Sequence, residues 1–282
     1  MQSLEGGAGV LVVLAACSFS PSGATGATGA DAGALQDSVE AGAGDGTAQQ
    51  TQGMRPDAAL ILGLVDLRSA GHFAILGEAG ISGISATVTG DLGASPVAAT
   101  YITGFSLTAD PTNQFWRSTQ VTGNVYAASD AAPTPAMLLT ANDDLQLAIT
   151  DAAGRAPDVT GLGSGELGGH TLAAGTYAFT GAAHVTTDLT LDGGVTAVWI
   201  FQVGGDLTLA ANAHVRLTGG ALASHVFWQV HGATTLAAMA HLEGVLLAET
   251  AFTGAAGVSV HGRVLAKTFA NVDGSTIVEP AP

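Results

Sequence analysis

Short segments in which apolar and polar residues alternate recur along the second half of the chain. The tetrad DLTL at 188–191 recurs 18 residues later at 206–209. The tetrad ATTL at 233–236 follows after 27 residues, which is one and a half such steps. Related tetrads at 251–254 and 269–272 then follow at the original step. Each unit of about 18 residues holds three strand-like pieces separated by glycine or asparagine, which is typical of one triangular coil of a β-solenoid. The sequence therefore predicts a mainly β fold built from stacked coils.

The alternation within each tetrad predicts which side chains face the solvent. At 206–209 the leucines point to the core, so Asp206 and Thr208 point outward. One predicted outward column consists of Thr190, Thr208, Thr235, Thr253 and Asn271, with Ser82 aligned from the N-terminal half of the chain. The neighbouring predicted column consists of Asp188, Asp206, Ala233, Ala251 and Phe269. Parallel stacking would place successive members of a column about 4.8 Å apart.

One segment has a different period. Between Thr134 and Gly154, apolar residues recur at spacings of three and four, which is typical of an amphipathic helix. The residues of this apolar stripe are Leu138, Ala141, Leu145, Ile149 and Ala152. Thr134 fits an N-cap, Pro135 fits the first helical position, and Gly154 fits the position after the last turn. We expect a helix over about 135–153 that lies along one face of the coils and covers apolar residues there.

The N-terminal residues indicate a targeting segment. The apolar run at 10–16 ends at Cys17, and the sequence LAAC resembles the bacterial lipobox, in which the cysteine is acylated. We expect residues 1–17 to be a lipoprotein signal peptide and the chain to be exported and lipid-anchored at the bacterial cell envelope or surface; without lipobox processing it would be secreted. The alternative is a structural cysteine. Residues 18–63 are rich in Gly, Ala, Ser and Gln and predict a disordered tether, which leaves residues 64–282 as the folded domain.

Composition and charge exclude several kinds of partner. With 7 Lys+Arg against 23 Asp+Glu, the formal net charge is −16 and no basic patch can neutralise phosphates, so nucleic acid is excluded. The single cysteine excludes a disulfide framework and a thiolate zinc site within this chain. His214, His241 and His261 fall at different offsets in their coils, so we expect solvated histidines, no metal site and no cofactor.

The carboxylates and basic residues are too dispersed for an enzyme. Polysaccharide lyases and hydrolases, another class with right-handed solenoids, need clustered carboxylates, usually with a basic residue nearby. Asp188 and Asp206 are the only carboxylates expected to stack, and the only lysine, Lys267, lies several coils away. Arg216 and Arg263 stand on different coils too. The sequence therefore predicts that the protein is not an enzyme.

Seven segments of the chain match one known pattern in order, among them WIFQVGGDLTLA at 199–210 and VFWQVHG at 226–232. The others are at 67–82, 88–105, 120–135, 148–155 and 243–268. Together they resemble the microbial ice-binding protein family. The resemblance implies a right-handed discontinuous β-solenoid flanked by one long helix, with the N-terminal segment supplying coils at one end. It also implies an antifreeze-type monomer that adsorbs to ice or an ordered water surface through a flat Thr-bearing face and inhibits ice growth and recrystallisation.

In that family the flat face carries a T-A/G-x-T/N motif. The tetrad TAFT at 250–253 fits it fully, TFAN at 268–271 has Phe in place of Ala or Gly, and 232–235 and 79–82 fit in part. The resemblance therefore implies that the following residues contact ice: Ser82, Thr190, Thr208, Ala233, Thr235, Thr250, Ala251, Thr253, Thr268 and Asn271.

Two features of the predicted face fit another function. Asp188 and Asp206 would hydrate strongly and disturb an ice-like water layer, and an exposed Phe269 suits a protein or glycan partner. The alternative is a surface-tethered structural or adhesive module that binds glycan or a partner protein. Threonine is also a good strand former, so a column of threonines arises from repetition alone. If the protein binds ice, replacement of Thr253 by tyrosine should sharply lower its inhibition of ice recrystallisation, so this substitution distinguishes the two functions.

Overall fold

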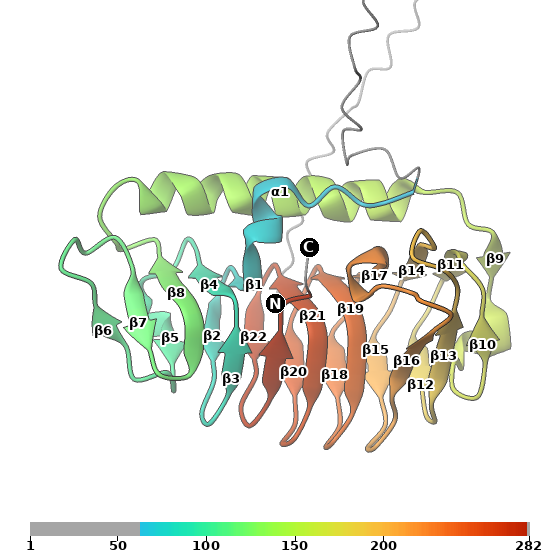
Figure 1. Ribbon diagram of the computed structural model, residues 1–282. Helices are drawn as coiled ribbons and strands as arrows, with labels where there is room; N and C mark the ends of the chain where they lie inside the picture. The colour runs from blue at the N-terminus through green and yellow to red at the C-terminus, as the bar shows by residue number, and fades with distance from the viewer. Residues whose placement is uncertain (1–62, 281–282) are drawn as a thin grey trace, which may run out of the picture. The chain divides into compact units, whose positions relative to one another are not determined.

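The computed structural model describes residues 63–280, which form parallel β-sheets and one long helix (Figure 1). The fold is therefore mainly β with parallel strands and one helix, as the sequence predicts. The expected signal peptide, Cys17 and all but the last residue of the expected tether lie outside the described residues. A short antiparallel hairpin closes one end, where β6 (Thr108–Ala109) pairs with β7 (Trp116–Ser118).

The strands fall into three sheets, here called A, B and C. Besides the hairpin, sheet A comprises β1 (Phe73–Gly77), β3 (Thr87–Thr89), β4 (Asp91–Ala94), β8 (Val121–Ala127), β9 (Val159–Thr160), β11 (Gly175–Phe179), β14 (Trp199–Val203), β17 (Val226–Val230), β19 (His241–Ala248), β21 (Ser259–Ala266) and β23 (Thr276–Val278). Sheet B comprises β2 (Gly80–Ser82), β5 (Ile102–Thr103), β12 (Ala183–Val185), β15 (Leu207–Leu209), β18 (Thr234–Leu236), β20 (Phe252–Gly254) and β22 (Phe269–Asn271). Sheet C comprises β10 (Thr171–Leu172), β13 (Leu189–Asp192) and β16 (Val215–Thr218).

Strands from distant parts of the chain lie side by side. Strand β1 pairs with β21, and β2 pairs with β22, in which Ser82 lies opposite Asn271. In Figure 1 the N-terminal strands, drawn in cyan, continue the row of C-terminal strands, drawn in red. The rows of parallel strands are therefore continuous in space. Their strands come from two parts of the chain, which the connection from β8 to β9, containing α1, separates in sequence.

The pairing in sheet B shows how far apart in the chain successive strands are. Thr235 lies opposite Thr253, and Thr253 opposite Asn271, so these strands follow each other at the step of the predicted repeat. Thr208 lies opposite Thr235 at the longer step that the tetrads predict, and His184 lies opposite Thr208 at an intermediate step. A constant repeat therefore describes only the C-terminal strands of this sheet.

Helix α1 (Thr134–Gly154) covers the outer side of sheet A (Figure 1). All five residues of its predicted apolar stripe are buried. They pack against sheet A residues that include Phe73, Ile200, Phe227, Leu247 and Leu265. Within residues 63–280 the short 3-10 helices are η1 (Arg68–His72), η2 (Ala99–Tyr101), η3 (Leu162–Gly165) and η4 (Ala223–His225). The apolar residues of sheet A that face α1 are therefore shielded from solvent by the helix.

The ends of α1 differ from the predicted capping, because Pro135 is the second helical residue and Gly154 is the last residue of the helix. Thr134 is the first helical residue and Pro133 the N-cap, and no side chain caps the N-terminal end. The Thr134 hydroxyl instead donates a 2.6 Å hydrogen bond to the carbonyl oxygen of Gln114, in the loop before β7. Thr134 therefore fixes the helix to the neighbouring loop and does not serve as a cap.

Asp144 attaches η1 to α1, and its replacement by asparagine is expected to lower the free energy of unfolding by about 2 kcal/mol. Its carboxylate, 14% exposed, accepts hydrogen bonds from the backbone N–H and hydroxyl of Ser69, and Arg68 lies 3.6 Å away. The Ser69 hydroxyl in particular lowers the pKa of Asp144. Because the pKa is lower in the folded state, this stabilisation is present at neutral pH and is lost as the pH falls below about 4. Urea unfolding at pH 7 and pH 3 measures the loss of stability and its dependence on pH. Asp143→Asn, at an exposed position of the same helix, is the matched control. If both variants lost the same free energy of unfolding, this role of Asp144 would be wrong.

Thr234 lies inside sheet B and carries a hydroxyl with no hydrogen-bond partner among the described residues. The residue is fully buried between Leu207 and Phe252 of the adjacent strands. Because valine has nearly the same shape without the hydroxyl, Thr234→Val is expected to raise the free energy of unfolding by about 1 kcal/mol. Chemical denaturation measures this gain, and a loss of stability would show that the hydroxyl is satisfied by a buried water.

Candidate functional site

The outer surface of sheet B, here called the B surface, carries one column of small polar residues. Alternation in burial shows the direction of the side chains: Thr234 and Leu236 are buried and Thr235 is exposed, and the same holds for Thr253 between Phe252 and Gly254. In order along the sheet, the column consists of His184, Thr208, Thr235, Thr253, Asn271, Ser82 and Thr103. Adjacent members stand about 4.8 Å apart, the spacing of hydrogen-bonded strands.

A second column contains mainly small side chains and lies beside the first. Each member lies two residues before a member of the first column, and the members are Ala182, Asp206, Ala233, Ala251, Phe269, Gly80 and Tyr101. On the other side of Thr235 and Thr253 lie Ala237 and Ala255, whose N–H groups donate to the preceding strand. At β18 and β20 the outward side chains are therefore only alanine and threonine, which gives a level, uncharged patch.

The hydroxyl groups of the column differ in what they bind. Thr208 Oγ1 lies 2.7 Å from Nδ1 of His184, and the Ser82 hydroxyl donates to Asp273 at 2.7 Å. The hydroxyls of Thr235 and Thr253 bind no other side chain or backbone group in the described part of the chain. The central pair is therefore available to water, whereas the hydroxyls of Thr208 and Ser82 are engaged within the protein.

Asp206 contributes the one carboxylate among the paired columns of the B surface described above. Its Oδ1 accepts a 2.8 Å hydrogen bond from the N–H of Ala233 at the corner before β18. Asp188 was expected beside it, but this residue precedes β13 in sheet C, where Arg216 binds its Oδ2 at 2.7 Å and lowers its pKa. The expected stack of two aspartates is therefore wrong, and the B surface is less charged than the sequence indicates.

Thr190 is the second prediction that the register overturns. It lies in β13 of sheet C, between Thr171 and Arg216, and not in the column of Thr208. The tetrads at 188–191 and 206–209 are alike because each sends two leucines into the same core, although they belong to different sheets. The position next to Thr208 is occupied by His184, which a constant repeat could not reveal.

Thr250 and Thr268 lie at the corners that lead into β20 and β22. The Thr250 hydroxyl donates a 2.6 Å hydrogen bond to the carbonyl oxygen of Gly232, on the adjacent strand connection. This contact stabilises the corner and withdraws the hydroxyl from the solvent. Of the ten residues expected to share one face, the structure brings together Ser82, Thr208, Ala233, Thr235, Ala251, Thr253 and Asn271 in the two columns.

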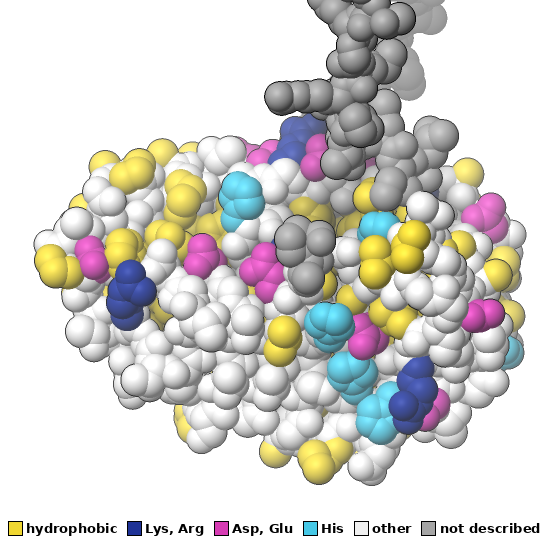
Figure 2. Space-filling model, in the orientation of Figure 1, with side chains coloured by type: hydrophobic (Ala, Val, Ile, Leu, Met, Phe, Trp, Pro, Cys, Tyr) yellow, Lys and Arg dark blue, Asp and Glu magenta, His cyan; other side chains and the backbone are white. Residues whose placement is uncertain are grey.

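The side formed by sheet C and the first halves of β19 and β21 is charged (Figure 2). His214 lies opposite His241, contrary to the expectation of different offsets, and their ring centroids are 6.3 Å apart. Glu243 binds His241 at 3.0 Å and His261 at 2.8 Å. Figure 2 shows these types of side chain gathered in a row. Among the described residues, no three His, Cys, Asp or Glu side chains are arranged to hold a metal ion.

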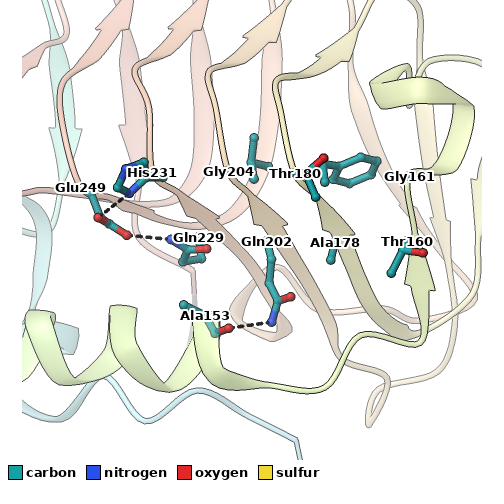
Figure 3. Close-up of a pocket in the computed structure, with 12 residues that line it drawn as sticks. Ala153, Thr160, Gly161, Ala178, Thr180, Gln202, Gly204, Gln229, His231 and Glu249 are labelled. Carbon is teal, nitrogen blue, oxygen red and sulfur yellow. Dashed lines mark hydrogen bonds and ion pairs between the residues drawn. The ribbon is translucent and has the colours of Figure 1, made fainter.

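An open groove of about 540 Å³ lies on sheet A beyond the end of α1 (Figure 3). Gln202 Nε2 donates to the carbonyl oxygens of Ala152 and Arg155, at 2.8 and 2.7 Å, and so caps the helix. Glu249 accepts from Gln229 and contacts His231 at 2.7 Å. The side chains of Gln202, Gln229, His231 and Glu249 at this groove, drawn in Figure 3, therefore hold the helix and neighbouring strands together.

No helix in the described part of the chain has both the length and the apolar character to cross a membrane. The fold and the B surface together define a class of protein. It is a repetitive parallel β protein that presents a level surface of alanine and threonine on one side, while a helix covers another side.

Comparison with known proteins identifies the family. The model of the family described as Ice-binding-like matches residues 75–278, and the chain belongs to this family. It is 44% identical over 216 residues to an ice-binding protein of Flammulina populicola, covering 76% of this chain and 87% of that protein. It is also 44% identical over 218 residues to an ice-binding protein of Leucosporidium sp. (strain AY30), covering 77% and 84%. The solved structure of LeIBP, an ice-binding protein with antifreeze activity from an Arctic yeast, superposes with a TM-score of 0.76 at 43% identity, covering 78% of this chain and 95% of that chain.

Proposed function

We propose that the protein binds ice through the B surface and inhibits ice growth and recrystallisation. The observation that carries the proposal is the central patch, where Thr235 and Thr253 stand in register and their hydroxyls are available to water. Ala233 and Ala251 flank them in the neighbouring column. The relatives compared above are ice-binding proteins, which favours this function over the adhesive alternative.

The chemistry of threonine suits contact with an ordered water lattice. Its hydroxyl hydrogen-bonds one water, and its methyl group disfavours other water orientations. The branched Cβ restricts χ1, so little side-chain entropy is lost when the surface binds. Each contact alone is weak because liquid water competes for it, and regular spacing on a rigid sheet lets many contacts form together.

The other sides of the molecule are less suited to ice. Helix α1 covers the part of sheet A that contains Phe73, Ile200, Phe227, Leu247 and Leu265, and these residues are buried beneath it. On the side of sheet C, Asp188, Arg216, His241, Glu243 and His261 form ion pairs and hydrogen bonds with each other. Charged groups hold their own hydration shells, and the B surface is therefore the side that can match an uncharged lattice.

The finer architecture belongs to the same proposal. We infer a right-handed discontinuous β-solenoid of triangular coils, whose three sides are the helix-covered part of sheet A, the B surface, and the side of sheet C. The constant step between the C-terminal strands and the insertion of β1 beside β21 support it. We further propose that the protein acts as a monomer without a cofactor or catalytic activity.

The place of action is proposed from the N-terminal sequence. The apolar run before Cys17 and the residues LAAC support export and lipid attachment at that cysteine. The Gly-, Ala- and Ser-rich residues after it would then act as a tether between the bacterial envelope and the ice-binding domain. A lipid anchor would be the one contact with a membrane.

Partitioning between ice and liquid tests the proposed function. The purified protein is mixed with an inert protein of similar size, and a fraction of the solution is frozen slowly onto a cold surface. We expect this protein to be enriched in the ice and the inert protein to remain in the liquid. Equal exclusion of both proteins from the ice would overturn the proposal.

A further inference from the structure

Gly80 is an outward residue that is nevertheless buried. It precedes Ile81, which points into the core, and it lies two residues before Ser82, which points outward. A Cβ on Gly80 would stand 2.8 Å from the carbonyl oxygen of Tyr101, the nearest atom, and 3.3 Å from both Cβ of Tyr101 and Cε2 of Phe269. The Tyr101 backbone therefore comes closest to this position, and the Phe269 ring reaches sideways from β22 into the remaining space that a side chain on Gly80 would need.

This arrangement explains a departure from the regular column. The second position of the T-A/G-x-T/N motif is occupied by Ala233 just before β18 and by Ala251 just before β20. At the start of β22 the same position is occupied by Phe269. Next to Phe269 comes Gly80, which has no side chain. One large ring thus serves two adjacent positions of the column. A φ of 134° at Gly80 also disfavours any other residue there.

The position of the ring matters because it lies where the two parts of the chain meet. Strand β22 comes from the C-terminal part and β2 from the N-terminal part, and they are neighbours in sheet B (Figure 1). Phe269 is 37% exposed, so much of the ring is covered by the sheet while one part remains at the surface. The apolar column that begins with Ala233 and Ala251 therefore continues over this junction.

We propose that Phe269 is an ice-contacting residue, which extends the apolar column of the B surface from β18 and β20 across β22 and β2. The inference rests on the proposed function. A longer rigid array makes more simultaneous contacts with a lattice, and the gain multiplies across the contacts. The apolar ring has no hydrogen-bonding group that would hold liquid water in a competing arrangement.

Replacement of Phe269 by alanine tests the inference in the full chain. We expect Phe269→Ala to raise the concentration needed to stop ice recrystallisation roughly fivefold, with a nearly unchanged melting temperature. Phe269→Leu should retain most of the activity, because leucine keeps an apolar group over Gly80. Leu139→Ala is the control, since Leu139 is a 60% exposed apolar residue on α1, away from the B surface.

The outcomes separate this inference from the proposed function. Unchanged or increased activity in Phe269→Ala, together with loss of activity in Thr253→Tyr, would overturn the role of Phe269 and leave the B surface in place. Unchanged activity in both variants would overturn the B surface itself. A melting temperature lowered in proportion to the activity would assign Phe269 a structural role and contradict ice contact.

Discussion

Replacement of Thr253 by tyrosine is expected to raise the protein concentration needed to stop ice recrystallisation by about tenfold or more. Thr253 stands at the centre of the level patch, between Thr235 and Asn271, and its side chain is exposed. A tyrosine ring would project from the sheet and hold a flat ice surface away from the neighbouring threonines and alanines. Because the residue faces solvent, thermal unfolding should change little.

The control for this variant is the same substitution on another side. Thr276 is also an exposed strand threonine, but it lies in β23 of sheet A, between Ser259 and Thr87. Thr276→Tyr is expected to inhibit recrystallisation as well as the unsubstituted protein does. If the two tyrosine variants lost activity equally, the assignment of ice binding to the B surface would be wrong.

Replacement of Phe201 by alanine is expected to lower the free energy of unfolding by about 4 kcal/mol. The fully buried ring lies between Tyr177 and Trp228, at centroid distances of 5.4 and 4.1 Å, and stacks on both. Alanine would leave a cavity on three successive strands, β11, β14 and β17, whose rigid spacing prevents collapse. Urea unfolding followed by far-ultraviolet circular dichroism measures this loss.

A second variant shows whether the cavity or the stacking is responsible. Phe201→Leu fills most of the volume and should cost clearly less stability than Phe201→Ala. At temperatures where both variants remain folded, each should retain ice recrystallisation inhibition, because Phe201 lies inside the core and not on the B surface. A loss below about 1 kcal/mol in Phe201→Ala would contradict the close packing of these rings.

The features predicted correctly from the sequence are those set by local periodicity. The stripe from Leu138 to Ala152 follows from the helical period alone, and all its members are buried. The outward direction of Thr208, Thr235 and Thr253 follows from alternation with apolar residues in strands. Both patterns depend on near neighbours in the chain, which a sequence shows directly.

The features that the sequence did not predict depend on contacts between distant residues. Thr190 and Thr208 occupy similar tetrads, but only strand pairing shows that they lie in different sheets. The cap at the end of α1 comes from Gln202, on a strand far along the chain. The burial of Gly80 under Phe269 brings together residues from the two ends of the domain. No local pattern carries this information.

The helix-covered part of sheet A, the side of sheet C and the B surface differ in the kind of side chains that they carry. The helix-covered side of sheet A supplies a second apolar core and rigidity, which keeps the strand spacing regular. On the side of sheet C, Asp188 forms an ion pair with Arg216, and the Glu243 carboxylate contacts the ring of His261 at 2.8 Å. The B surface is thereby left with few charges at its centre, as recognition of an uncharged lattice requires.

Growth of a single ice crystal in the presence of fluorescently labelled protein tests the central claim most directly. The protein and its Thr253→Tyr variant would each be offered to a growing ice hemisphere, and fluorescence in the ice would be imaged. We expect the unsubstituted protein to label defined planes of the ice and the variant to remain in the liquid. Equal labelling by both would contradict binding through the B surface, and absence of label with the unsubstituted protein would contradict ice binding itself.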